Sequence, residues 1–179
     1  MTAALLLALG LALPPQRRPP VILAVTPACA QLREIAAHEP PEYVFASNGA
    51  HWREETGTAV PESAQAVAAA WERGRRIRFV AVTRSGGAAN TIEYDDYCFD
   101  PAGRLRYLRE EFRSVAQDLI AVRERGWTAA GQLNGQERHY FWLASGKPRP
   151  APPGAGRQPA APVYAHTSEL PFARFLPKT

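Results

Sequence analysis

Lysine, methionine and cysteine are scarce in this chain of 179 residues. Only Lys147 and Lys178 are lysine among 21 basic residues, and no stretch gathers five or more basic residues. Such a cluster usually marks a nucleic-acid site, so we expect no nucleic-acid partner despite the net charge of +4. Residues 3–13 are apolar throughout, but a helix needs roughly 20 such residues to cross a bilayer. We therefore expect no transmembrane helix.

The sequence motifs of common enzymes are also missing. There is no G-x-S-x-G, no phosphate-binding G-x-x-x-x-G-K, no H-E-x-x-H and no glycine-rich dinucleotide motif. The cysteines and histidines do not have the spacing of a zinc site. We expect no cofactor and no metal ion. The absence of these motifs favours a protein that is not an enzyme.

The apolar residues 3–13 are typical of the middle of a secretory signal peptide. Small residues at positions 10 and 12 predict cleavage after Ala12, and those at 28 and 30 predict cleavage after Ala30. A buried N-terminal helix is the alternative interpretation. We expect an exported, bacterial-type protein that resides in the periplasm or outside the cell.

Cys29 and Cys98 are the only cysteines, and their fate depends on that cleavage site. If both remain, an oxidising compartment favours one disulfide that closes a long loop. If the chain is cut after Ala30, Cys98 is left alone as a small buried residue. The sequence leaves both outcomes open.

Two helices are predicted in the N-terminal part of the domain. Thr26 and Pro27 suit a helix start, and Pro40 and Pro41 end that helix. A second helix is predicted from Pro61, because four apolar residues recur at helical spacing: Ala64, Val67, Ala68 and Trp71. A short strand is possible at residues 43–47, before the Asn-Gly turn at positions 48 and 49.

From residue 76 onward the apolar period changes from 3.6 to 2. Strands are predicted from residue 76 and at residues 91–99, 104–112, 118–127 and 132–143, and their short connections favour antiparallel pairing. The predicted fold class is α+β. A five-stranded antiparallel meander at about residues 76–144 follows two N-terminal helices and precedes a short C-terminal segment. The helices are expected to cover one face through Leu32, Ile35, Val67 and Trp71.

The connections at residues 100–103 and 128–131 predict one kind of hairpin turn used twice, 28 residues apart. Each has an aromatic residue before the turn, a glycine in it and a leucine after it. The first turn predicts that Phe99 faces Leu105, Tyr97 faces Tyr107 and Asp95 faces Arg109.

The second turn predicts pairs between Trp127 and Leu133, Arg123 and Glu137, Ile120 and Tyr140, and Leu119 and Phe141. A turn at Asn134 and Gly135 is the alternative. Residues 99–105 resemble the core of bacterial YD repeats, a resemblance that implies a hairpin and no function.

Residues 26–147 are predicted to form a single domain. The prolines of residues 148–162 predict a semi-extended linker or loop. Residues 163–179, in which Phe172, Phe175 and Leu176 recur at helical spacing, are expected to dock on the sheet.

Three sets of residues are candidates for a functional site. His51 and Glu54 would share a face of a helix and could relay a proton or bind a metal, although a polar loop is the simpler interpretation. A second set holds acids and arginines that suit either acid–base chemistry or a charge ladder on a solvated face: Glu93, Asp95, Asp96, Asp100, Arg104, Arg106 and Arg109. Aromatic residues that could line a ligand groove or form the core make the third set: Tyr97, Tyr107, Trp127, Tyr140 and Trp142.

The expected function is a non-catalytic binding or structural protein of the cell envelope. Its partner would be an unknown protein or small ligand there. A small exported hydrolase that uses His51 with an acidic residue is one alternative. A carrier of apolar ligands is another, and it requires a hollow under the sheet.

Overall fold

The computed structural model describes residues 27–49, 51–55, 61, 63–86, 90–154 and 160–177. Residues 1–26, which hold most of the predicted signal segment and Thr26, lie outside the described residues. The described chain forms one α-helix, eight strands and two short 3₁₀ helices at Thr167–Glu169 and Ala173–Phe175. The helix is α1 (Pro27–His38), and the strands are β1 (Tyr43–Ser47), β2 (Trp52–Glu54), β3 (Ala66–Glu72), β4 (Ile77–Ser85), β5 (Thr91–Phe99), β6 (Leu105–Ser114), β7 (Leu119–Trp127) and β8 (Leu133–Trp142).

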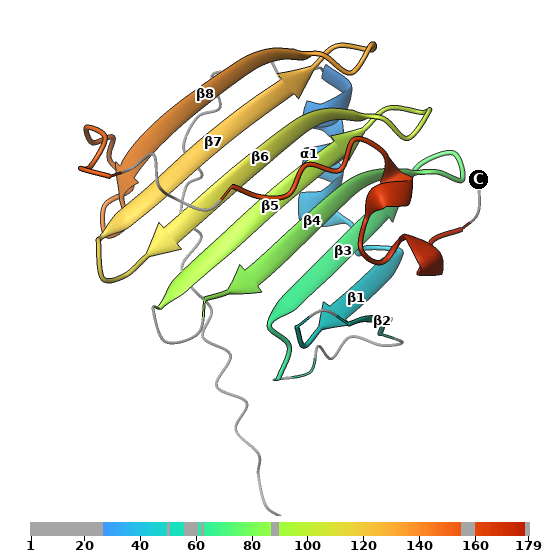
Figure 1. Ribbon diagram of the computed structural model, residues 1–179, viewed down its shortest axis with the longest axis horizontal. Coiled ribbons are helices and arrows are strands. Elements are labelled where there is room, and N and C mark those ends of the chain that lie inside the picture. The colour runs from blue at the N-terminus through green and yellow to red at the C-terminus, as the bar shows by residue number, and fades with distance from the viewer. Residues whose placement is uncertain are drawn as a thin grey trace, which may run out of the picture.

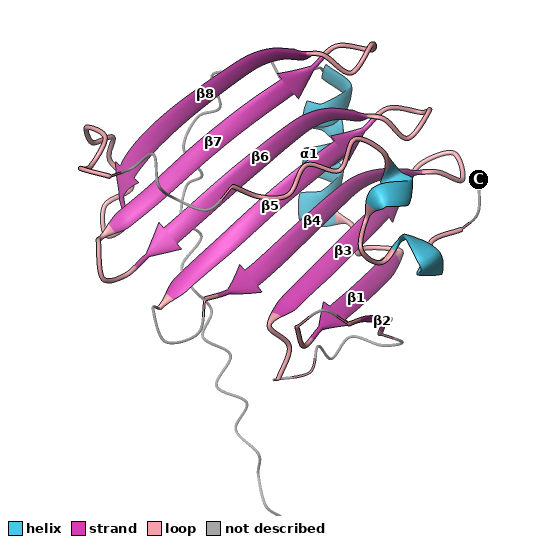
Figure 2. Cartoon of the chain, in the orientation of Figure 1, coloured by secondary structure: helices cyan, strands magenta, loops and turns pink. Residues whose placement is uncertain are grey.

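All eight strands form a single antiparallel sheet in the order β2-β1-β3-β4-β5-β6-β7-β8 (Figure 1). The predicted α+β fold, with five strands and two N-terminal helices, is therefore wrong. The described chain is largely β and has a single α-helix (Figure 2). The five predicted strands correspond to β4–β8, and the strands β1, β2 and β3 extend the sheet beyond them.

The predicted second helix is strand β3. It pairs with β1 on one side and β4 on the other, and it is buried or half-buried along its length. A strand enclosed in this way is apolar at nearly every position, so its spacing matches a helix as well as a strand. The helical spacing of Val67, Ala68 and Trp71 is thus a coincidence of an alanine-rich interior strand.

The first predicted helix is present as α1, and it packs against β4 and β5. Cys29 and Leu32 are its buried residues, and they join Trp71 and Phe79 in one apolar cluster. The Trp71 indole N–H donates to the carbonyl of Glu39, just beyond the helix, at 3.1 Å. We call the face of the sheet under α1 the helix face.

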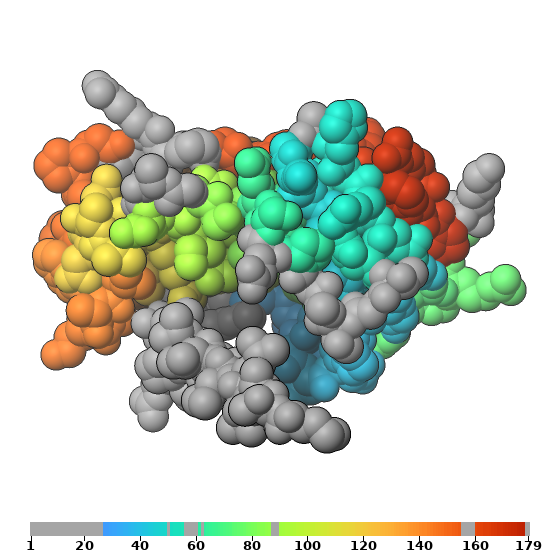
Figure 3. Space-filling view, turned by 90° about the horizontal axis from the view of Figure 1, so that it is seen from below, coloured from blue at the N-terminus to red at the C-terminus, as the bar shows by residue number. Residues whose placement is uncertain are grey.

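Residues 160–177, here called the C-terminal strap, cross the other face of the sheet, which we call the strap face. Figures 1 and 3 show α1 and the strap on opposite sides of the strands. Leu170 and Phe172 of the strap are buried in the larger apolar cluster. The ring of Phe172 stacks on that of Phe45 with centroids 4.5 Å apart. The strap therefore supplies part of the core.

Both predicted hairpin turns are confirmed. Gly103 and Gly131 have φ angles of 74° and 78°. Each donates its N–H to the carbonyl three residues earlier, at 2.9 and 3.0 Å. A glycine suits each turn because this left-handed backbone disfavours any residue with a Cβ. The alternative turn at Asn134 and Gly135 is wrong, since both residues lie within β8.

The predicted registers hold only next to each turn. Phe99 faces Leu105 and Trp127 faces Leu133, as expected. A β-bulge then follows in both hairpins and shifts every later pair by one residue.

The remaining predicted pairs are therefore wrong. In the first hairpin Tyr97 faces Leu108, and Arg109 faces Asp96. The pairs that replace the predicted ones in the second hairpin are Arg123 with Arg138, Ile120 with Phe141, and Leu119 with Trp142.

Candidate functional site

His51 and Glu54 do not lie on a helix. His51 is exposed and directly precedes β2, and Glu54 is the exposed last residue of that strand. The predicted common face needs helical spacing, because residues three apart in extended backbone point to opposite sides. Among the described residues, no group of three or more histidine, cysteine, aspartate or glutamate side chains could hold a metal ion.

The aromatic candidates do not form one surface. Tyr97 packs with the strap-face cluster, and Tyr107 packs with the helix-face cluster. Both rings are buried, whereas Trp127 is half-buried and Trp142 is 40% exposed. The Arg149 guanidinium lies 3.7 Å from the centroid of the Trp142 ring. Most of this set is core, and Trp142, its one exposed member, already has the Arg149 guanidinium on its ring.

The acidic and basic candidates are divided between the two faces of the sheet. Asp95 and Glu110 are cross-strand neighbours on β5 and β6. Asp95 pairs with Arg84, and Glu110 pairs with Arg123 and with Arg125 at 3.0 Å. The prediction of a charge ladder on a solvated face is wrong here, because Asp95 and Glu110 are both buried.

The strap covers this group, which we call the strap-face charge cluster (Arg84, Asp95, Glu110, Arg123 and Arg125). The Ala161 N–H donates to Glu110 Oε1 at 2.7 Å. Arg125 Nη2 donates to the Ala161 carbonyl at 3.4 Å. The Tyr97 hydroxyl donates to the Pro162 carbonyl at 3.1 Å. The cluster therefore fixes the first residues of the strap on the sheet.

Burial dominates the electrostatics of the strap-face charge cluster. Desolvation raises the pKa of Asp95 to about 6, with Glu110 and Glu93 adding to the rise and Arg84 opposing it. Desolvation likewise raises the pKa of Tyr97 far above its ordinary value, with a further contribution from Asp95. A carboxyl that titrates near 6 can exchange a proton close to neutral pH, but here the strap shields it.

A second group of charges is buried on the helix face. Arg109 pairs with Glu111, and Arg33 of α1 lies 3.7 Å from Asp96. The Tyr107 hydroxyl donates to Glu124, whose residue has no exposed surface. Burial favours a higher pKa for Glu111, but Arg109 and Arg113 outweigh it and lower that pKa. This group joins the helix to the sheet, and Arg109, Glu111 and Glu124 at its centre are buried.

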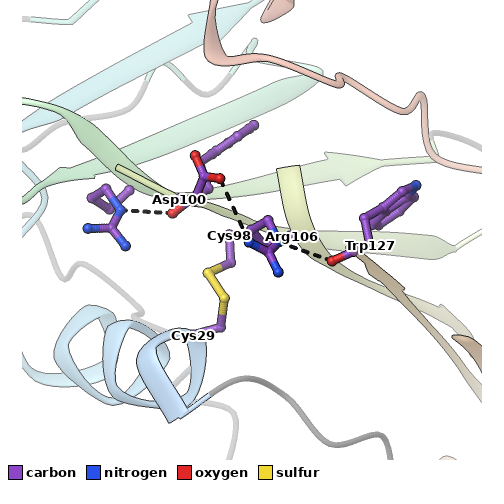
Figure 4. The surroundings of a disulfide bond; sticks show 7 residues. Cys29, Cys98, Asp100, Arg106 and Trp127 are labelled. Carbon is purple, nitrogen blue, oxygen red and sulfur yellow. Dashed lines mark hydrogen bonds and ion pairs between the residues drawn. A yellow bond between two sulfur atoms is a disulfide. The ribbon is translucent and has the colours of Figure 1, made fainter. Parts of the chain in front are cut away.

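A disulfide between Cys29 and Cys98 ties α1 to β5 (Figure 4). Near it, Arg106 Nε donates to the carbonyl of Trp127 at 3.0 Å, and Arg106 Nη1 lies 3.8 Å from Asp100 Oδ2. The two sulfur-bearing residues are 2% and 0% exposed. The bond is thus part of the helix-face core.

Two cavities lie where the strap meets the hairpin turns. The larger, of about 440 Å³, is lined by Arg76, Ile77, Gly103, Thr167, Ser168 and Arg174, among others. The smaller, of about 310 Å³, is lined by Arg104, Leu105, Trp127, Val163 and His166, among others. None of the described lining residues of either cavity is acidic. We call Arg76, Arg104, His166 and Arg174 the basic rim.

Sequence reasoning named Arg104 and Trp127 but not the basic rim as a whole. Arg76 and Arg174 are nearly 100 residues apart in the sequence, and the strap alone brings them to one cavity. This cavity could have been predicted only from the path of the strap across the sheet.

Comparisons with models of protein families, with curated proteins and with solved structures find no match for this chain. Among the described residues, no helix combines the length and apolarity that a membrane span requires. The residues of the chain are therefore the sole basis for a function.

Proposed function

We propose that this protein is an exported, disulfide-stabilised binding protein that takes a small amphipathic anion in the 440 Å³ cavity of the basic rim. The observation on which the proposal rests is the lining of that cavity. Arg76 and Arg174 stand at it with the hydroxyls of Thr167 and Ser168, while Ile77 and Leu176 provide apolar surface. Its volume lies within the range of small-molecule sites.

A carboxylate or phosphate group suits this lining. Arginine binds such groups through paired N–H donors, and hydroxyls add further donors. The apolar residues favour a ligand that carries an alkyl or aryl group next to its charge. Neither a carrier of fully apolar ligands nor a hydrolase has comparable support. Leu170 and Phe172 fill the apolar strap face, and His51 lacks an acidic partner on a shared face.

Export is supported by the apolar residues 3–13 and by the disulfide, because disulfides persist in oxidising compartments. Intact mass of the protein recovered from the periplasm or medium tests this, with and without reductant. Cleavage after Ala12 retains the disulfide and gives a mass gain of two hydrogens on reduction. Cleavage after Ala30 removes Cys29 and would contradict the disulfide-stabilised form.

Binding is tested by calorimetry with octanoate, benzoate and inorganic phosphate as probes. We expect octanoate and benzoate to bind more tightly than phosphate, and binding to weaken with added salt. Arg76→Ala and Arg174→Ala should each raise Kd about 10-fold, the loss expected for one charge-assisted hydrogen bond.

Arg138→Ala is the matched control, because it removes an exposed arginine on β8 away from both cavities. Equal losses in all three variants would mean that only net charge matters. That result, or the absence of heat with every probe at millimolar concentration, would refute the anion site.

A further inference from the structure

The outer edge of β8 is open over part of its length. The opposite edge of the sheet, β2, is only three residues long, whereas β8 has ten. Residues 147–149 cover the last part of β8, where Trp142 N–H donates to the Lys147 carbonyl and Arg149 N–H donates to the Tyr140 carbonyl. Among the described residues, no backbone group bonds to the outer edge between residues 135 and 139. A long unpaired edge is a template for another strand.

The hydrogen bonds at the covered end of β8 show which backbone groups of the strand point away from the sheet. The backbone N–H and C=O of every second residue in an edge strand point away from the sheet. Tyr140 and Trp142 form such outward hydrogen bonds, so the backbone groups of Arg138 and Gln136 also point outward. The side chains of Gln136 and Arg138 are exposed. The strand contains no proline, which would have removed an outward donor.

Charge disfavours two of the registers in which two such edges could pair antiparallel. A two-fold axis at Glu137 would place Glu137 opposite its own copy, and an axis at Arg138 would do the same for Arg138. Like charges directly opposite each other destabilise a sheet. An axis at Gln136 instead places two neutral amides opposite each other, Arg138 opposite Asn134, and Glu137 opposite Gly135.

We propose that two copies of this chain pair antiparallel through β8, with Gln136 on the two-fold axis, to form one continuous sheet across the dimer. The interface is a short edge and belongs to the small, weak class, so the dimer is concentration-dependent. The pairing is independent of the basic rim and of the ligand proposed for it.

Site-specific cross-linking tests the register. At the axis the two Gln136 Cα atoms would be about 5.5 Å apart, which is within the range that a disulfide bridges. Gln136→Cys should therefore give a covalent dimer under mild oxidant, and reductant should reverse it. Arg138→Cys is the matched control. In this register the two copies of residue 138 are four residues out of line, or roughly 13 Å apart, so they should remain unlinked.

Sedimentation of the unmodified chain from about 1 µM to about 1 mM should show a monomer–dimer equilibrium. Gln136→Pro removes an outward N–H at an edge position that tolerates proline, and it should weaken the dimer at least tenfold. A chain that stays monomeric throughout, or equal cross-linking at positions 136 and 138, would overturn the pairing. A monomer that instead takes up a strand from another protein would overturn it as well.

Discussion

Each buried acid on the strap face of the sheet is paired with an arginine of its own. Asp95 lies opposite Glu110, an unfavourable neighbour, and each acid has its own arginine partner. Buried ion pairs gain little net stability, because desolvation offsets their attraction. The raised pKa of Asp95 follows from that balance.

Asp95 should make the protein less stable as the pH rises from about 4 to about 6. The unfolded carboxyl titrates near 3.8 and the folded one near 6. In that window the folded state therefore binds a proton that the unfolded state has lost. The pKa difference corresponds to about 2–3 kcal/mol of unfolding free energy. Above pH 6 both states are ionised and this contribution is constant.

Denaturant unfolding of wild type and Asp95→Asn at pH values from 4 to 7 measures the effect. The variant should lose the slope between pH 4 and 6, so the difference between the two proteins isolates Asp95. Glu34→Gln, an exposed acid of α1 on the other face of the sheet that does not act on Asp95, is the control and should keep the slope. Parallel profiles for wild type and Asp95→Asn would contradict a raised pKa.

Sequence reasoning found Asp95 and Arg109 but assigned them to each other. The bulge after the first turn separates them. Its extra residue lies in β6, so it turns Arg109 to the helix face with Asp96, while Asp95 stays on the strap face with Tyr97. The same register shift hid the other neighbours of Asp95, which are Glu110, Arg123 and Arg125. A one-residue shift changes the face of every side chain, and no residue near the turn signals it.

At the level of elements, local patterns predicted the hairpins well. The boundaries of β5 and of β1 match the expected ranges, and both glycine turns form. The failure at β3 has another cause, since alanine strongly favours a helix and is depleted in strands, so the local preference of this alanine-rich segment is overridden. Its identity depends on β1 and β4 at its sides, which is tertiary information.

The two hairpin turns differ in one respect that predicts different tolerance. A Cβ added at Gly103 would lie 2.8 Å from Thr167 Oγ1 of the strap, while one added at Gly131 meets open space. Both substitutions strain a left-handed backbone by about 1–2 kcal/mol. Gly103→Ala should therefore cost roughly 1 kcal/mol more than Gly131→Ala, because it also displaces the strap. Chemical denaturation of the two variants measures this.

The Thr167→Ala background provides the control, because it removes the hydroxyl that a new Cβ would meet. In that background the two glycine substitutions should cost the same. If Gly103→Ala remains the more harmful one there, the strap contact is not the cause.

For the molecule as a whole, the disulfide links segments 69 residues apart. Closing a loop of this length in the unfolded chain corresponds to about 4 kcal/mol in the chain-entropy model, and removal of a native disulfide typically costs 2–5 kcal/mol. Replacing both Cys29 and Cys98 by serine should therefore lower the free energy of unfolding by about 2–4 kcal/mol. Thermal or denaturant unfolding checks this value.

Reduction of the native protein provides a second measurement. Both cysteines are buried, so reductant without denaturant should leave the disulfide intact, and thiol labelling should begin only on unfolding. Rapid labelling of the folded protein in reductant would mean that α1 detaches readily from the sheet.

The position of the strap in the sequence affects how the protein is made. Leu170 and Phe172 follow all eight strands in the chain, so their places in the core stay empty while the strands are translated. Until the strap docks, the apolar strap face of the sheet is exposed, and it can aggregate or bind chaperones. We expect folding to depend on holdase activity until the strap has been made, and chains truncated before the strap to be degraded rather than to accumulate.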